Sequence, residues 1–147
     1  MRAIAPIAPP TMPPLSPLVA AHLLAALAAL VIGPIALWGT RKGSRSHRAA
    51  GYLWVALMVA TAATAAGLRD HGAWTWGGFS PIHLLVPFVA YHLVRGLWAV
   101  AHGQIERHRK HMRGLYLGGC LVAGAFTLLP GRYLGDLLWT HTFNLLA

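Results

Sequence analysis

Four long apolar segments alternate with short polar stretches along the chain. They cover about residues 17–38, 49–68, 81–101 and 113–129. Because a helix rises about 1.5 Å per residue, segments of this length are sufficient to cross a hydrocarbon core of about 30 Å. The pattern predicts an all-α fold, a four-helix transmembrane bundle within residues 17–130.

Signals for helix ends support three of these boundaries. Ser16-Pro17 and Ser80-Pro81 each place a capping serine before a proline in the first helical position. Pro130 follows the fourth segment, where a proline stops a helix.

The two ends of the chain differ from the bundle. Residues 1–17 contain six of the ten prolines and lack the basic start and apolar stretch of a secretory signal, so residues 1–16 are predicted to form a disordered arm. Residues 131–147 are too short to cross a membrane. Their apolar side chains predict a short interfacial helix on the outer face: Leu134, Leu137, Leu138 and Trp139.

Composition strengthens the membrane assignment. Hydrophobic residues make up 56% of the chain and charged residues 10%, against about a quarter charged in a soluble domain. Twelve Lys and Arg residues face three acidic ones, which gives a formal net charge of +9. Eight cations lie in the first and third polar stretches: Arg41, Lys42, Arg45, Arg48, Arg107, Arg109, Lys110 and Arg113. Since the charge is confined to these stretches, it indicates topology rather than nucleic-acid binding.

The positive-inside rule turns this distribution into an orientation. It places the first and third polar stretches in the cytoplasm and both termini on the outer side of a bacterial inner membrane. The same cations are expected to meet anionic lipid head groups, where each contributes about 1 kcal/mol.

The scarcity of acids and of cysteine excludes several chemistries. Asp70, Glu106 and Asp136 are the only acidic residues, and Cys120 is the only cysteine. This excludes paired-carboxylate catalysis, a hard-cation site, an intramolecular disulfide and a thiolate-rich metal site. The sequence also lacks a nucleophile–base–orienter set, a P-loop and a dinucleotide fingerprint. Histidine is left as the carrier of function, and no enzyme class is indicated.

An internal duplication relates the two halves of the bundle. His22 begins a His-Leu-Leu triplet that recurs at His83, and His47 begins a His-Arg pair that recurs at His108. Both offsets are 61 residues. Each unit contains two helices, so both units cross the membrane in the same sense. The bundle is therefore predicted to consist of two tandem two-helix repeats.

His22 and His83 form the clearest candidate site. Ionisable residues at membrane depth are costly and usually face the bundle interior. One hypothesis is that both imidazoles are axial ligands of a b-type haem iron, which needs neither cysteine nor carboxylate. The alternative is that both are structural and form hydrogen bonds to carbonyls or hydroxyls across a helix interface.

A second group of histidines lies at the cytoplasmic ends of the helices and consists of His47, His108 and His111. His108 and His111 are three residues apart and share a helical face. The group is a candidate for a second metal site, and the competing interpretation is a solvated basic rim. Arg95, an intramembrane cation, is a candidate partner for a haem propionate or a lipid phosphate.

Several motifs together resemble a known family. They are the leading His22 with Gly33-Pro34, His47-Arg48-x-x-Gly51-Tyr52, Gly78-Phe79-Ser80, and His108-Arg109-x-x-Met112-Arg113-x-x-Tyr116 followed by Pro130 and Arg132. Over about residues 18 to 135 the chain resembles the bacterial family of predicted membrane proteins known as a domain of unknown function with His-Arg-x-x-Gly and His-Arg-x-x-Met-Arg signatures. The resemblance implies a small polytopic membrane protein and supplies no catalytic residues.

Two functions of different classes follow from these observations. The first is binding of b-type haem for membrane electron transfer. The second is a non-catalytic partner or assembly subunit of a larger membrane complex, or a homo-oligomer, that docks through small-residue faces such as Gly114 and Gly118. A transporter or channel fits less well, because few polar side chains line the middle of the apolar segments.

Overall fold

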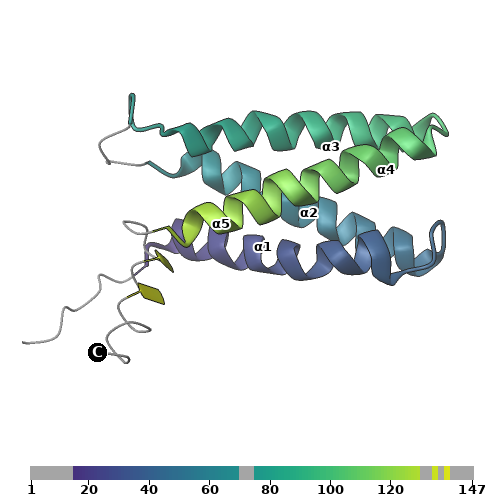
Figure 1. The fold of residues 1–147 in the computed structure, drawn as a ribbon, viewed down its shortest axis with the longest axis horizontal. Coiled ribbons are helices and arrows are strands. Elements are labelled where there is room, and N and C mark those ends of the chain that lie inside the picture. The colour runs from purple at the N-terminus through teal and green to yellow at the C-terminus, as the bar shows by residue number, and fades with distance from the viewer. Residues whose placement is uncertain (1–14, 70–74, 130–133, 136–137, 140–147) are drawn as a thin grey trace, which may run out of the picture.

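Four helical rods lie side by side in the computed structural model, which describes residues 15–69, 75–129, 134–135 and 138–139 (Figure 1). The rods are formed by α1 (Pro17–Pro34) with the π-helix η1 (Ile35–Gly39), α2 (Arg45–Gly67), the 3₁₀ turn η2 (Pro81–Leu84) with α3 (Leu85–Ala101), and α4 (Ile105–Gly114) with the π-helix η3 (Leu115–Val122) and α5 (Ala123–Thr127). The all-α prediction is confirmed for this part of the chain. The predicted arm, residues 1–16, and the predicted interfacial tail, residues 131–147, lie almost wholly outside the described residues.

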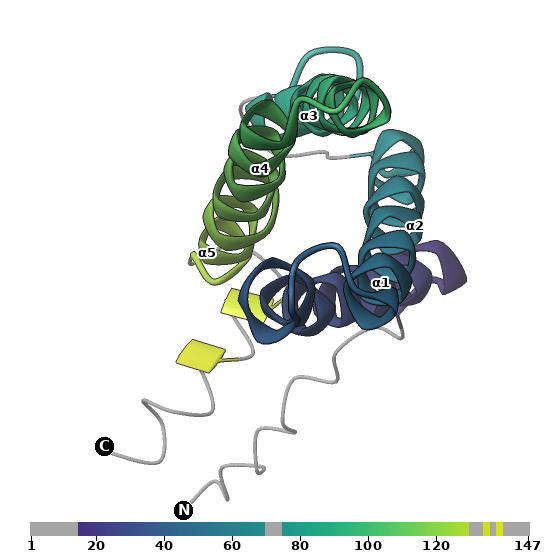
Figure 2. The same ribbon diagram turned by 90° about the vertical axis from the view of Figure 1, so that its right-hand side faces the viewer.

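The rods form a ring in chain order when they are viewed end-on (Figure 2). The first rod therefore lies diagonally opposite the third, and the second lies diagonally opposite the fourth. Among the described helices, three are long and apolar enough to cross a membrane: Pro17–Gly39, Arg45–Gly67 and Pro81–Ala101. The fourth rod is not one of these, because its first half is basic.

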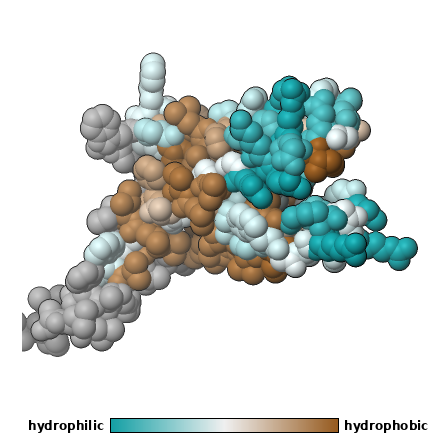
Figure 3. Space-filling model, turned by 45° about the vertical axis from the view of Figure 1, so that its right-hand side comes forward, coloured by the Kyte–Doolittle hydropathy of each residue, from teal (hydrophilic) through white to brown (hydrophobic). Residues whose placement is uncertain are grey.

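The surface is apolar along most of the length of the rods. Leu24 is 69% exposed, Val31 is 63% exposed and Val94 is 66% exposed. Figure 3 shows hydrophobic residues over the middle of the bundle and hydrophilic ones at one end. We call it the basic end, and it carries the connections at residues 40–44 and 102–104. Lipid tails are the solvent that suits such an exposed apolar belt.

The first rod begins where its sequence predicts. It also contains Pro34, and the fold supplies the hydrogen bond that this proline cannot make. Ser16 caps the rod by accepting a hydrogen bond from the Val19 amide at 3.3 Å. Pro34 has no N–H to donate to the carbonyl four residues earlier, that of Leu30. The hydroxyl of Tyr116, on the fourth rod, donates to this carbonyl at 3.3 Å instead. The bundle thereby satisfies the acceptor that proline leaves open.

Two helices begin earlier than the apolar pattern predicts. The second starts at Arg45 rather than near residue 49, because Ser44 accepts a hydrogen bond from the His47 amide at 3.1 Å and caps it. The fourth starts at Ile105 rather than near residue 113. Gly103, at φ +71°, makes the tight turn before it. Most of the cations assigned to loops therefore lie on the first turns of helices.

A ladder of hydrogen bonds joins the first two rods into a hairpin. Three side chains each donate to a carbonyl of the other rod: His22 Nδ1 to Thr61 O at 3.1 Å, Trp54 Nε1 to Ala29 O at 3.0 Å and His47 Nδ1 to Ala36 O at 3.0 Å. The two residue numbers of every rung add to 83, and successive rungs are seven residues apart. Seven residues is the repeat at which coiled helices keep facing each other.

Glycines let the rods approach closely. A Cβ at Gly33 would lie 2.6 Å from a ring carbon of Tyr116, so only glycine admits this ring between the first and fourth rods. A Cβ at Gly118 would lie 2.6 Å from the Phe88 ring. The small residues of the fourth rod therefore receive side chains of this same chain. The core around them consists of Ala29, Trp54, Met58, Val89, Leu93, Met112, Leu115, Tyr116 and Cys120.

Candidate functional site

His22 is held in one tautomer at the end of the bundle opposite the basic end. Its Nδ1 lies 3.1 Å from the Thr61 carbonyl and 3.0 Å from the Thr64 hydroxyl oxygen. Since a carbonyl only accepts, Nδ1 carries the proton and Nε2 carries a lone pair. No residue in the described part of the chain forms a hydrogen bond with Nε2, and this atom is not fully buried. His22 thus has a free acceptor or metal-ligand atom.

His83 has both ring nitrogens occupied. Its Nδ1 accepts from the Ser80 amide at 3.1 Å, as part of the cap that starts the third rod. Its Nε2 donates to the Leu68 carbonyl at 3.0 Å. The edge of the Phe79 ring packs against the imidazole at 5.1 Å between centroids. His22 and His83 therefore have separate hydrogen-bond partners, and no direct contact joins them.

An interior cavity of about 200 Å³ lies beside His22. Its walls come from all four rods and are almost entirely apolar. Ile82 and Leu85, the neighbours of His83 on the third rod, line it from the side diagonally opposite His22. Thr61 and Cys120 also line the cavity, but the Thr61 hydroxyl donates to Leu57 O at 2.8 Å and the Cys120 thiol faces the Met58 sulfur at 3.5 Å. The Thr127 hydroxyl, a further polar group of the lining, donates to Gly124 O at 2.7 Å. Among the polar side chains of the described lining residues, His22 is thus the one with a ring nitrogen that has no hydrogen-bond partner.

His47 and His108, at the basic end, share one geometry. Nδ1 of His47 donates to the Ala36 carbonyl at 3.0 Å, and Nδ1 of His108 donates to the Gly96 carbonyl at 2.9 Å. Each histidine lies in the first turns of a helix and is bonded to the last turns of the preceding rod. Each is therefore fixed within its own hairpin, and each presents Nε2 as the unprotonated nitrogen.

The structure pairs His111 with His92, which the sequence analysis did not anticipate. Their Nδ1 atoms lie 3.3 Å apart, and their ring centroids are 5.1 Å apart. His92 Nδ1 also lies 3.2 Å from the His111 carbonyl, the acceptor for its proton. Gly114 makes room for the His92 ring, because a Cβ there would lie 2.9 Å from it. His111 thus faces the third rod rather than His47.

The short turn between the third and fourth rods indicates which residues of this hairpin lie near His92. Residues 102–104 join the third and fourth rods, so residues equally distant from residue 103 face each other in an antiparallel hairpin. This relation sets His92 opposite Gly114, and His111 precedes Gly114 by three residues, about one helical turn. The His92 ring lies against both positions, a contact that the helical face shared by His108 and His111 does not indicate.

Arg95 lies on the exposed side of the third rod. Its guanidinium carbon is 5.7 Å from the centre of the Trp98 ring, which is a cation–π contact. Within the described residues, no group of three or more His, Cys, Asp or Glu side chains is close enough to hold a metal ion. A metal in this part of the chain would therefore rely on two histidines at most.

The basic end collects like charges from both hairpins. The Lys42 ammonium donates to the carbonyls of Leu37 and, at 3.4 Å, Ala36, and so caps the end of the first rod. Burial, followed by the like charges of Arg109 and Arg113, lowers the pKa of Lys42 below its usual value. The loop after the first rod and the start of the fourth rod are therefore within electrostatic reach of each other.

Comparison with known proteins gives a match over most of the bundle. The family described as Predicted membrane protein (DUF2306) matches residues 19–130. No curated protein and no solved structure matches the chain.

Proposed function

The chain belongs to the family described as Predicted membrane protein (DUF2306), and from that premise we propose that it binds b-type haem for membrane electron transfer, with His22 and His83 as the residues that would hold the iron. Bound haem would supply one-electron chemistry, and this chain would supply ligands, an apolar enclosure and exclusion of water. The observation that carries the proposal is the open Nε2 of His22 beside an apolar cavity.

His22 meets the requirements for an iron ligand. The Thr61 carbonyl keeps the proton on Nδ1 and leaves the Nε2 lone pair for the metal. A hydrogen bond from Nδ1 also fixes the orientation of the ring and makes the Nε2 lone pair a stronger ligand for a metal. Thr64, which adds a second oxygen at 3.0 Å, strengthens this arrangement.

The cavity has the right lining but must widen. Small side chains at Ala26, Ala29 and Gly119 leave room beside the imidazole. Its volume of about 200 Å³ is below the range of about 300–1,000 Å³ in which drug-sized ligands are bound. Uptake of a macrocycle therefore requires the first and third rods to separate. These rods stand diagonally opposite each other, on the two sides of that space (Figure 2).

His83 must change partner to become the second ligand. Its Nε2 has to release the Leu68 carbonyl, and a neutral hydrogen bond of this kind contributes about 1 kcal/mol. Its neighbours Ile82 and Leu85 line the cavity but His83 does not, so the imidazole also has to turn from Leu68 toward the cavity. The offset of 61 residues gives His22 and His83 equivalent places in the two hairpins.

The proposal includes an orientation in the membrane. The positive-inside rule puts the basic end in the cytoplasm of a bacterial inner membrane. Both termini then lie outside, and the fourth rod crosses the membrane over about residues 113–129. The His22 site would lie near the outer face and the His47 and His108 pair near the inner face.

Absorption spectroscopy tests the haem site. The full chain, produced with haem supplied and purified in mild detergent, is expected to show a Soret band that shifts on reduction. His22→Ala and His83→Ala are each expected to lose it. His102→Ala is the matched control and is expected to keep it, because His102 is exposed and bonds only to its own helix at Trp98 O, 2.8 Å away.

Two results would overturn the proposal. One is a colourless protein after haem has been supplied, and the other is a Soret band that survives in both His22→Ala and His83→Ala. If a colourless protein co-purifies with a larger membrane complex, the function becomes that of the non-catalytic partner or assembly subunit.

A further inference from the structure

The basic end has an uncompensated cluster of cations between the two hairpins. Lys42 comes from the first hairpin, and Arg109 and Arg113 come from the second. The two hairpins meet beside these cations, because Trp38, four residues before Lys42, contacts Tyr116, three residues after Arg113, with 5.6 Å between ring centroids. The charges of Arg109 and Arg113 both act on Lys42. In the described part of the chain, Glu106 is the one acidic residue, and its carboxylate pairs with Arg109 while it remains 83% exposed. Lys42 and Arg113 have no acidic partner in the part of the chain that the structure describes.

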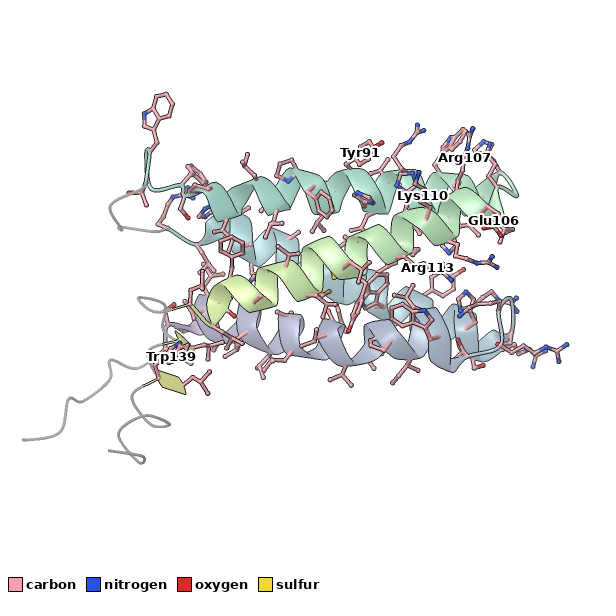
Figure 4. The ribbon with its side chains drawn as sticks, viewed as in Figure 1. Tyr91, Glu106, Arg107, Lys110, Arg113 and Trp139 are labelled. Atoms are coloured by element: carbon pink, nitrogen blue, oxygen red, sulfur yellow. The ribbon has the colours of Figure 1, made fainter. Side chains whose placement is uncertain are left out.

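The cations of α4 divide into two sets. Arg107 and Lys110 lie on the side of α4 away from the first hairpin, whereas Arg113 lies on the side that faces it (Figure 4). Arg107 is bonded to Gln104 at 2.9 Å. Arg113 has no hydrogen bond or ion pair to any residue that the structure describes. Arg113 is thus the guanidinium best placed to bind a ligand between the hairpins.

Apolar surface continues from this cluster along the rods. Trp38 and Tyr116 join the first and fourth rods by an edge-to-face contact at 5.6 Å. Trp38 is 52% exposed, and Ile35 on the first rod and Leu117 on the fourth rod are also exposed. A ligand that places an anionic group on the cations can therefore lay a hydrocarbon chain along these side chains. This combination favours a lipid over a free anion.

We propose that Lys42, Arg109 and Arg113 bind the phosphate of an anionic phospholipid, such as phosphatidylglycerol, between the two hairpins at the basic end. A guanidinium binds phosphate oxygens through paired N–H groups, while an ammonium acts as a point charge. The lipid would join the hairpins where their own charges drive them apart. This site does not depend on the binding of haem.

Binding of short-chain lipids tests the proposal. The full chain in a neutral detergent is titrated with dioctanoyl phosphatidylglycerol, dioctanoyl phosphatidylcholine and inorganic phosphate, and binding is followed by thermophoresis. Phosphatidylglycerol is expected to bind at least tenfold more tightly than the other two, and 0.5 M salt is expected to weaken it. Phosphatidylcholine of equal affinity, or inorganic phosphate of equal affinity, would overturn the lipid assignment.

Matched variants locate the site. Arg113→Gln and Lys42→Gln are each expected to weaken phosphatidylglycerol binding about fivefold, the equivalent of about 1 kcal/mol per cation near an anionic surface. Arg107→Gln removes the same charge from the other side of α4 and is expected to change binding less than twofold. Equal losses in Arg107→Gln and Arg113→Gln would show a diffuse rim and overturn the proposal. Arg113→Lys is the control for misfolding of Arg113→Gln. It keeps the positive charge and is expected to bind phosphatidylglycerol.

Discussion

The close contact at Gly33 leads to a prediction whose size follows from the structure. In Gly33→Ala, the new Cβ would lie 2.6 and 2.7 Å from two ring carbons of Tyr116 and 3.0 Å from Trp54 Nε1. Trp54 is fully buried and Tyr116 nearly so, and both are hydrogen-bonded to carbonyls of α1, so neither ring can move without losing a bond. Overpacking of this kind costs about 1–3 kcal/mol.

A second helical glycine provides the control. A Cβ at Gly51 on α2 meets nothing within 4 Å. Both substitutions replace glycine by alanine within a helix, and the higher helix propensity of alanine stabilises each variant by about 1 kcal/mol. The difference in the free energy of unfolding between Gly33→Ala and Gly51→Ala therefore isolates the steric contact. We expect Gly33→Ala to be less stable by about 1–3 kcal/mol.

Thermal unfolding in mild detergent, followed by circular dichroism, measures this difference. One kcal/mol corresponds to about 2–4 °C for a chain of this size. In a Tyr116→Leu background the ring is absent and only the contact with Trp54 at 3.0 Å remains, so the destabilisation by Gly33→Ala is expected to be smaller than in the wild type. A Gly33→Ala protein that melts at or above the temperature of Gly51→Ala would refute the packing argument.

Three further predictions concern a cap, a second glycine and a titration. Ser44→Ala removes the acceptor of the His47 amide and is expected to lower the free energy of unfolding by about 1 kcal/mol, measured by the same melts. Gly114→Ala forces a Cβ to within 2.9 Å of the His92 ring and is expected to lower the melting temperature, whereas Gly124→Ala meets nothing within 4 Å and should not. Because the pKa of Lys42 is lower in the folded state than in the unfolded state, its charge opposes folding at neutral pH; stability is expected to rise as pH increases through the lowered pKa toward 10.5. Comparison of wild type with Lys42→Gln from pH 8 to 10.5, in neutral detergent without lipid, checks this, and parallel curves would contradict it.

The apolar pattern predicts the four rods well, because an apolar segment in the hydrocarbon core must pair its own backbone N–H and C=O groups and therefore forms a helix. Four segments and their approximate positions follow from length and hydropathy, and the starts at Ser16 and Ser80 follow from caps. The early starts at Arg45 and Ile105 are missed because basic residues were counted as loop. A serine cap or a one-turn ion pair between Glu106 and Arg109 makes such residues helical without any apolar face.

The candidate site is less accessible to prediction, because tautomer and partner depend on contacts between rods. The sequence indicates that His22 and His83 occupy equivalent places, but the hydrogen bonds of the two are different. The bond from Tyr116 to Leu30 joins residues 86 apart, and no local pattern indicates it. The short turn reveals the register that sets His92 opposite Gly114, but the contact of His92 with His111, three residues away, depends on how the two side chains turn.

The ladder within the first hairpin has a consequence for how the protein enters the membrane during synthesis. All three rungs join residues between 22 and 61, so they can form before the second hairpin has left the ribosome. The translocon would then release a hairpin whose imidazole and indole N–H groups already have acceptors. The second hairpin, in which His92 is bonded to the His111 carbonyl and His108 to the Gly96 carbonyl, would follow as another unit and dock through the Gly33 contact. Genes split between residues 67 and 80 are therefore expected to yield two fragments that insert separately and reassemble.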